Sequence, residues 1–360
     1  MKFAFPSLFT CILVVGLAAA CQNQPDPLPL TPVPSPNLTI QASEEALYPP
    51  YYNGLLVWGG FVYFGYGQEL YWLEVSDPTQ PVLRGHLTLP NRLTHITLNG
   101  DQAQLILTTP SGSSSATLAD GWQQLDLSEP PRPHLTTFYD SPLNLRHILI
   151  YRDTAFLATS ETALIRLDLS NAAAPRTLSP IGNFEGSLWA LGLYDHYLLV
   201  ESAWCLRSCS STLNVLDAAA PQQPLSQYAH YGAFPTLLVD PPHVILAGST
   251  IHTLDLTRPE QPTLVAELEV PAFITSAVKQ GDWLYAATGS GLITFNLSQM
   301  EQPQQVNQQL ETLYLNQISY DGDLLAVIAP HSGLYLFSLT DPAAPRPLAY
   351  FQLPVPGDTP

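Results

Sequence analysis

The stretch LEVSDPTQP at residues 73–81 ends an apolar segment with an acid, a hydrophobic residue, a small polar residue and a turn closed by proline. Related stretches recur six more times along the chain. The seven copies read LYWLEVSDPTQP from Leu70, WQQLDLSEPPRP from Trp122, LIRLDLSNAAAP from Leu164, TLNVLDAAAPQQP from Thr212, IHTLDLTRPEQP from Ile251, LITFNLSQMEQP from Leu292 and LYLFSLTDPAAP from Leu334. Their closing prolines are Pro81, Pro133, Pro175, Pro224, Pro262, Pro303 and Pro345, so successive copies lie 52, 42, 49, 38, 41 and 42 residues apart. A repeat of this length with strand patterning is typical of a β-propeller blade.

The sixth copy shows the predicted blade most clearly. Strands are expected at residues 276–279 and 283–288, and a Ser290-Gly291 turn leads into the repeated stretch as a third strand. A fourth, weaker strand is expected at residues 304–310, after the proline turn. Four short strands punctuated by Gly, Asp and Pro match an antiparallel blade. The sequence therefore predicts an all-β fold, a seven-bladed β-propeller of four-stranded antiparallel blades, over residues 47–356.

A single blade is too thin to bury both of its apolar faces, so neighbouring blades must cover them and closure of the ring must stabilise every member. The sequence leaves the manner of closure open. The segment NLTIQAS at residues 37–43 could add a strand to the last blade, or the ring could close between complete blades.

The N-terminus has the features of a targeting segment. Lys2 precedes an almost wholly apolar run at residues 3–17, and Ala18-Ala19-Ala20 leads into Cys21. This resembles a bacterial lipoprotein signal, with residues 1–20 removed and Cys21 lipidated. The alternative is an ordinary secretory signal cut after Ala20. Residues 21–46 are Pro-rich and predict an extended tether, which favours the lipoprotein because an anchored domain needs a spacer.

No later stretch reaches the roughly 18 to 20 apolar residues that span a bilayer, so attachment is expected by lipid only. Gln22 after the cysteine points to the outer membrane if the host has two membranes. We therefore expect an extracytoplasmic protein held at the bacterial cell envelope.

The chain is strongly acidic, with 12 basic and 30 acidic residues and a net charge of −18. Such a surface repels phosphate backbones, which argues against nucleic-acid binding and against docking onto an anionic bilayer by charge. Because the acids are scattered along the chain, they do not indicate a cation site. No metal and no cofactor is predicted.

Cys205 and Cys209 remain after the cysteines of the N-terminal segment are set aside. An oxidising compartment favours a disulfide between them that closes a tight local loop. Metal or redox chemistry is the alternative, but no histidine pair with zinc spacing lies nearby and the spacing is not C-x-x-C.

The third-strand sequence resembles the LVIVD repeat, a strand motif followed by S-D-P-x-x-P, and residues 73–81 match it closely. The resemblance extends over all seven units. Asn296 and Ser338 replace the acid, and the fourth copy reads LDAAAP without the serine. Members of this family are bacterial exported or cell-surface propellers, so the resemblance implies a scaffold and brings no catalytic residues.

The acids that end the third strands hold the same place in different blades, so they should form a ring rather than a converging site. We interpret them as structural, because a carboxylate there can accept N–H groups of the turn. These acids are Glu74, Asp126, Asp168, Asp217 and Asp255.

The axial channel is the other candidate site, because first strands converge on it. His95 and His147 fall in register in neighbouring blades, with Arg146 beside the second. Two imidazoles could hold a metal or share a proton role, or they could simply hydrogen-bond where their strands begin. The positions matched by register are Gly54, His95, His147, Ala190, Thr236, Ser276 and Gln317.

Other features carry weaker signals. Tyr48-Pro49-Pro50-Tyr51-Tyr52 precedes the first strand and could offer stacking surfaces to a glycan or peptide. The chain has no H-E-x-x-H, G-x-S-x-G, EF-hand or P-loop motif. Copies of the repeat differ most at the two histidines, at Cys205–Cys209 and in the serine-rich loop at residues 110–117.

We therefore predict a lipid-anchored, non-catalytic binding or scaffold module for an envelope protein, peptide or glycan. The alternative is a propeller hydrolase or lyase with a site in the axial channel around His95, His147 and Arg146.

Overall fold

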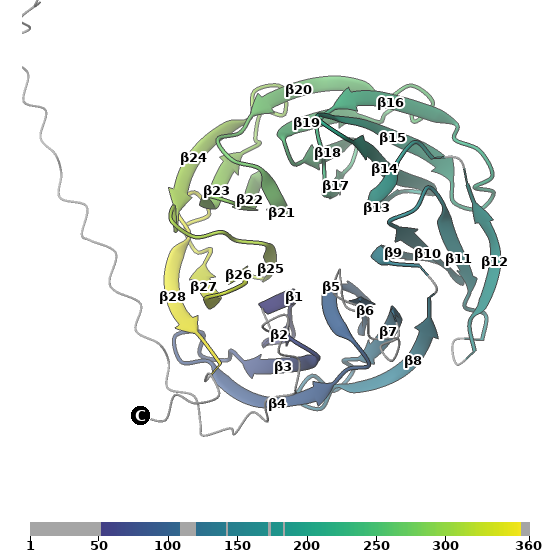
Figure 1. The fold of residues 1–360 in the computed structure, drawn as a ribbon. Coiled ribbons are helices and arrows are strands. Elements are labelled where there is room, and N and C mark those ends of the chain that lie inside the picture. Colours follow the sequence, from purple (N-terminus) through teal and green to yellow (C-terminus); the bar gives the residue numbers. More distant parts are fainter. Residues whose placement is uncertain (1–51, 109–119, 142, 172–173, 183, 354–360) are drawn as a thin grey trace, which may run out of the picture.

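The computed structural model describes residues 52–108, 120–141, 143–171, 174–182 and 184–353. These residues form 28 strands in seven four-stranded antiparallel sheets. The sheets stand side by side as the blades of a ring, with the first strand of each blade innermost and the fourth at the rim (Figure 1). The structure thus confirms the predicted all-β seven-bladed propeller. No helix in the described part of the chain is long and apolar enough to cross a bilayer.

The strands follow the chain in order within every blade. The first four blades comprise β1 (Tyr52–Trp58), β2 (Phe61–Tyr66), β3 (Glu69–Glu74) and β4 (Val82–Thr88); β5 (Arg92–Asn99), β6 (Gln102–Thr108), β7 (Gly121–Asp126) and β8 (His134–Asp140); β9 (Leu145–Tyr151), β10 (Thr154–Thr159), β11 (Leu164–Asp168) and β12 (Arg176–Ile181); and β13 (Ser187–Tyr194), β14 (Tyr197–Cys205), β15 (Cys209–Asp217) and β16 (Ser226–Tyr231).

The last three blades have the same layout. They comprise β17 (Thr236–Asp240), β18 (His243–Ala247), β19 (Thr250–Asp255) and β20 (Thr263–Glu269); β21 (Ile274–Gln280), β22 (Trp283–Thr288), β23 (Gly291–Asn296) and β24 (Gln304–Gln309); and β25 (Gln317–Asp321), β26 (Leu324–Ala329), β27 (Gly333–Ser338) and β28 (Arg346–Phe351).

The core lies between blades, because alternate residues of each inner strand face opposite neighbours. In β2, Val62 and Phe64 pack toward the seventh blade, whereas Phe61 and Tyr63 pack toward the second. Among the described residues the buried hydrophobic side chains form seven such clusters, one for each interface between blades. This confirms that neighbouring blades cover the apolar faces.

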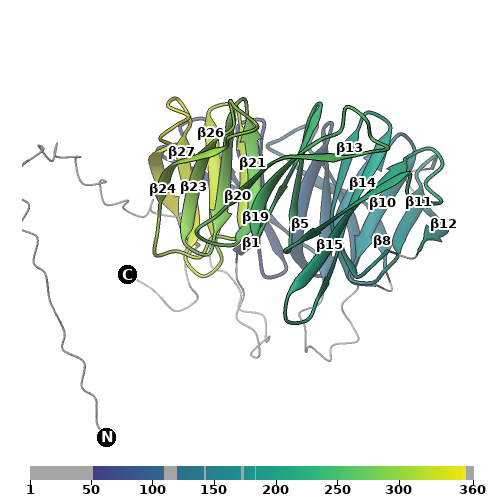
Figure 2. The ribbon, with the colours of Figure 1, turned by 90° about the horizontal axis from the view of Figure 1, so that it is seen from above.

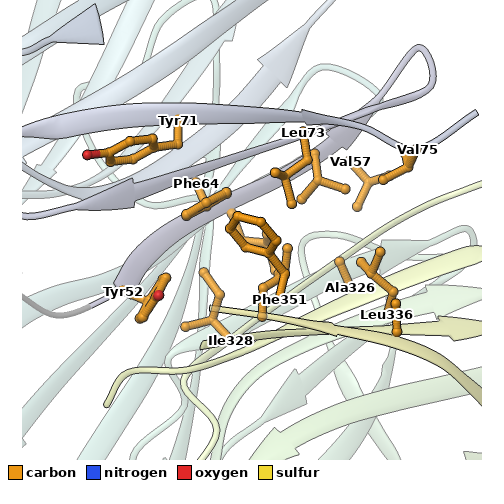
Figure 3. Close-up of a cluster of buried hydrophobic side chains, with 14 of the residues drawn as sticks. Tyr52, Val57, Phe64, Tyr71, Leu73, Val75, Ala326, Ile328, Leu336 and Phe351 are labelled. Carbon is orange, nitrogen blue, oxygen red and sulfur yellow. The ribbon is translucent and has the colours of Figure 1, made fainter. Parts of the chain in front are cut away.

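The ring closes where the seventh blade meets the first. Phe351 of β28 packs edge-on against Phe64 of β2, with 6.1 Å between ring centroids (Figure 3). The Tyr52 N–H donates to the carbonyl of Pro330 at 2.9 Å, and the Leu353 N–H donates to the Tyr52 hydroxyl at 2.6 Å. In the described residues both blades draw all four strands from their own repeats, so closure is between complete blades. Residues 37–43 lie outside the described part of the chain.

The two ends of the ring hold different turns between strands, and Figure 2 shows the ring from its side. Because each blade is an antiparallel meander, the start of the first strand lies at the same end as the turn between the second and third strands. We call this end the upper face, and in Figure 2 it is turned toward the bottom of the picture, where the long hairpin of β14 and β15 extends. The repeated proline turns, between third and fourth strands, lie at the opposite end, which we call the lower face.

The Ser-Gly turn predicted from the sequence has a steric requirement. Gly291 opens β23 with φ +98°, and a Cβ atom there would lie 2.1 Å from the carbonyl oxygen of Gln309. Gly333 repeats this in the seventh blade, with φ +138° and the oxygen of Phe351 at 2.4 Å. Only glycine allows the fourth strand to pair this closely with the start of the third.

Replacing Gly291 with Ala is expected to lower the free energy of unfolding by about 2 kcal/mol or more, since it adds left-handed backbone strain to a backbone clash. The matched control is Gly281→Ala, where φ is +55° and nothing lies within 4 Å of the added Cβ. That variant adds strain without a clash and should cost about 1 kcal/mol. Urea unfolding of both variants measures the difference, and equal losses would contradict the steric account.

Candidate functional site

The acids that end the third strands stabilise turns, as predicted. Oδ1 of Asp126 accepts the Ser128 N–H at 2.8 Å, and Oδ1 of Asp255 accepts the Thr257 N–H at 2.7 Å. Asp168 accepts from its own turn in the same way and also pairs with Arg176 at 2.7 Å, and these contacts hold the pKa of its carboxyl well below the usual range. These carboxylates are therefore occupied within their own blades.

The copies that depart from the acid keep the same role. Oδ1 of Asn296 accepts the Ser298 N–H at 2.8 Å, and the Ser338 hydroxyl accepts the Thr340 N–H at 3.2 Å. Glu74 differs in accepting the Ser76 hydroxyl at 3.2 Å rather than a backbone N–H of its turn, and it pairs with Arg84 of β4 as Asp168 does with Arg176. Since neutral acceptors replace the carboxylate, the position requires an oxygen acceptor rather than a charge.

On the upper face, β-bulges shape the start of the inner strands. In five of the seven first strands the pairing with the second strand skips one residue. The skipped residues are Gly54, Thr94, Arg146, Trp189 and Thr275. A bulge bends the strand and re-aims the side chain of the extra residue. These positions therefore project differently from their neighbours in the strand.

Two of the bulge side chains form hydrogen bonds to nearby backbone carbonyls. The Thr94 hydroxyl donates to the carbonyl of Ile106 at 3.1 Å, and the Thr275 hydroxyl reaches the carbonyl of Ala287 at 2.9 Å. Arg146 and Trp189 cannot repeat this contact with a hydroxyl. Instead the Arg146 guanidinium lies over the Trp189 indole, with 5.1 Å from Cζ to the ring centroid. The third and fourth blades thus use the bulge for a cation–π pair.

The channel contains a cavity of about 590 Å³ at this end. It is lined by the first halves of the inner strands, including His95, Arg146, His147 and Trp189. Arg146 is the one charged side chain among its described lining residues. Partial burial lowers the pKa of this guanidinium below its ordinary value, although the group stays charged. A lone cation therefore faces a cavity lined by neutral polar and apolar side chains inside a strongly acidic protein.

His95 and His147 lie side by side in this cavity, with 4.7 Å between ring centroids. Burial lowers the pKa of His95 to about 4, and burial together with the charge of His95 lowers that of His147 to about 3. Nε2 of His95 and Nδ1 of His147 are buried without a hydrogen-bond partner among the described residues. The rings are thus neutral at pH 7, with hydrogen-bonding capacity left over.

A second hollow of about 410 Å³ adjoins the channel and shares Arg146 and Trp189 with it. Its far wall is the hairpin of β14 and β15, whose tip is closed by a disulfide between Cys205 and Cys209. Trp204 on this hairpin also lines the hollow, and its side chain is 58% exposed. The structure therefore brings the channel histidines and the cysteine hairpin to one continuous surface. We call this surface the channel-mouth groove.

The register places the other matched positions with one correction. His95, Ala190 and Ser276 each follow a bulge and pair with the second strand. In the first blade that place belongs to Leu55, not to Gly54, because Gly54 is itself the skipped bulge residue. Counting residues back from the turn predicted Gly54 at this place. A bulge inserts one residue but leaves the alternation of buried and exposed side chains in the strand unchanged, so the sequence does not reveal the shift.

Residues 110–117, Cys21 and the Tyr48-Pro49-Pro50-Tyr51 segment lie outside the described residues. Tyr52 belongs to the core, where its ring packs against Phe64 at 5.9 Å between centroids, so it offers no free stacking surface.

A buried polar cluster between the fourth and fifth blades was not foreseen. Nε2 of His230 lies 3.2 Å from Oε1 of Glu201, and both side chains are almost fully buried. His252 packs against His230 with 5.4 Å between centroids, and burial raises the pKa of Glu201. The one signal was an acid inside the apolar strand LLVESA at residues 198–203. The lining of the channel-mouth groove includes none of these residues, so we assign them a structural role.

In the described part of the chain no three His, Cys, Asp or Glu side chains are grouped so that they could hold a metal ion. No family model and no curated protein matches the chain. Its resemblance to the LVIVD repeat therefore stays a prediction from the repeated sequence.

Solved structures share the fold at low sequence identity. A chain of the mitotic checkpoint complex is 13% identical with a TM-score of 0.60, over 88% of this chain and 96% of that one. A functionally unknown protein from Desulfotomaculum acetoxidans is 13% identical with a TM-score of 0.57, over 81% and 92%. The computationally designed Ika8 protein is 10% identical with a TM-score of 0.55, over 81% and 85%. These likenesses concern the fold alone.

The lowered pKa values of the channel histidines have a consequence for stability. Between pH 6.5 and about 3 the two histidines are protonated in the unfolded chain but stay neutral in the folded protein. Because the unfolded state then binds more protons, the free energy of unfolding should fall as the pH drops through this range. Arg146 is the one charged side chain among the described residues that line the same cavity. Replacing both histidines with Gln should flatten the fall.

Melting temperatures of the wild type and the double Gln variant between pH 8 and pH 4 test this. The exposed His134, changed to Gln, controls for loss of a histidine as such. Parallel pH profiles for the wild type and the double variant would show that the pair is not held neutral.

Proposed function

We propose that the protein is a lipid-anchored binding module of the bacterial cell envelope whose ligand site is the channel-mouth groove. The observation that carries this proposal is Arg146, a cation without an ion pair among the described residues, at a cavity whose described lining holds no carboxylate. A partly buried charge without a partner is unfavourable. An anionic group on a ligand would supply that partner. A concave site with a few convergent polar groups is typical of ligand binding.

Binding accounts for the histidines better than acid–base catalysis does. A general acid or base works best with a pKa near the working pH. His95 and His147 have pKa values of about 4 and about 3, which leaves them weak bases and almost never acids at neutral pH. No carboxylate among the described residues lines the channel cavity to raise them. Neutral imidazoles suit hydrogen bonding to a ligand instead.

Several features support the envelope location. The apolar N-terminal segment ends in three alanines before Cys21, and a Pro-rich spacer follows. The disulfide between Cys205 and Cys209 fits an oxidising compartment outside the cytoplasm. A net charge of −18 argues against adsorption to anionic lipid, so a covalent lipid is the more economical means of attachment.

Lipidation at Cys21 can be tested by metabolic labelling with an alkyne fatty acid in a bacterial host. The wild type should incorporate the label, and Cys21→Ala should lose it entirely because no other thiol is available for the lipid. Cys11→Ala is the matched control and should label as the wild type does, since that residue is removed with the signal. An unlabelled wild-type protein would contradict lipid anchoring.

The ligand site can be located with a thermal-shift panel of small organic acids, sugars and short peptides on the full-length protein. A ligand at one hundred times its Kd stabilises the folded state by about 2.7 kcal/mol, which gives a clear rise in melting temperature. Arg146→Gln should weaken the response at least tenfold. Arg258→Gln makes the same change in charge on the lower face and should respond as the wild type does.

A ligand that stabilises both arginine variants equally would place the site elsewhere on the ring. A panel without any ligand that depends on Arg146 would contradict the proposal.

A further inference from the structure

We propose that the channel-mouth groove takes a carboxylate-bearing sugar of the hexuronate class, with the carboxylate on Arg146 and the sugar hydroxyls on the channel wall. This inference rests on the proposed function and names the ligand class of the same site. Three properties of the groove carry it: its single cation, the neutral polar groups in its lining and its exposed indole.

The cation requires an anionic group on the ligand. No ion pair of Arg146 is present in the described part of the chain, and its guanidinium is held in place by the Trp189 ring at 5.1 Å. A guanidinium presents parallel N–H donors that match a carboxylate in a two-point contact. The flanking imidazoles are neutral, so the site offers one positive charge. One charge matches a monoanionic carboxylate better than it matches a phosphate dianion.

The rest of the channel wall requires hydroxyl groups. The lining presents Thr236, Ser276 and Gln317 at the start of three successive inner strands, together with the rings of the two histidines. Neutral hydroxyl, amide and imidazole groups both donate and accept hydrogen bonds. A polyhydroxylated ring can satisfy many of them at once, whereas a purely apolar acid would leave them without partners and pay for their desolvation.

The groove beyond Arg146 offers an apolar surface for a second sugar. Trp204 is 58% exposed and lines the adjoining hollow, on a hairpin closed by the Cys205–Cys209 disulfide. An indole packs its flat face against the apolar C–H surface of a sugar. A disaccharide can therefore extend from the channel along the groove to the hairpin.

The test is isothermal titration of the full-length protein with glucuronate, glucose and acetate. Glucuronate should bind one to one, at least tenfold more tightly than glucose, which lacks the carboxylate, and than acetate, which lacks the ring. Arg146→Gln should remove at least tenfold of the affinity for glucuronate and leave glucose unchanged. Arg258→Gln on the lower face should bind all three as the wild type does.

The second subsite is tested with a diuronate. Trp204→Ala should weaken the diuronate at least threefold and leave monomeric glucuronate unchanged, which also shows that the variant is folded. An equal loss of affinity for the diuronate and for glucuronate would show that the hollow beside Trp204 is not a separate subsite.

Two results would overturn the inference without touching the proposed function. If acetate binds as tightly as glucuronate, the site binds a carboxylate but makes no favourable contact with the sugar ring. If none of the three binds while the thermal-shift panel yields another ligand that depends on Arg146, the ligand class is wrong and the site stands. If no ligand depends on Arg146, both fail together.

Discussion

Each blade of this protein can bury its two apolar faces only against the blades on either side. Seven hydrophobic clusters therefore hold the described ring together, and each belongs equally to two blades. The contact of Phe351 with Phe64 belongs to the cluster that joins the two ends of the ring, together with the hydrogen bonds of Tyr52 to Pro330 and Leu353. Without it the first and last blades would each expose a face, so closure between complete blades determines whether the central channel exists at all.

The repeated stretch has a structural role on the lower face, and the proposed ligand site lies on the other face. The strand-end acceptors and prolines shape turns on the lower face, where one solution is used in nearly every blade. The bulges at the starts of the inner strands are less uniform. Thr94 and Thr275 hydrogen-bond to nearby backbone there, whereas other blades form the same bulge without a threonine. In the third and fourth blades Arg146 and Trp189 occupy the bulge and form the channel-mouth groove. The repeat therefore builds the frame, and the proposed ligand site lies where the copies depart from it.

Much of this architecture could be predicted from the sequence. The period of the prolines gave seven blades, and the strand-end acids were correctly interpreted as turn acceptors. Register placed His95 beside His147, which the structure brings within 4.7 Å between ring centroids. The bulges were not predictable, because one inserted residue leaves the hydrophobic period on either side unchanged. That is why Gly54 was misaligned and why Trp189 was missed. The groove between Arg146 and the Cys205–Cys209 hairpin depends on how two blades pack, which no local pattern encodes.

The most direct test of a ligand site at the channel mouth is a titration of ¹⁵N-histidine-labelled protein with glucuronate, followed through the side-chain nitrogen resonances. His95 and His147 should shift progressively and saturably, because both rings line the cavity that the ligand enters. His196 and His243, at the lower-face turns, should not move. Saturable shifts confined to the lower-face histidines, or saturable binding that leaves all imidazoles unchanged, would contradict the account.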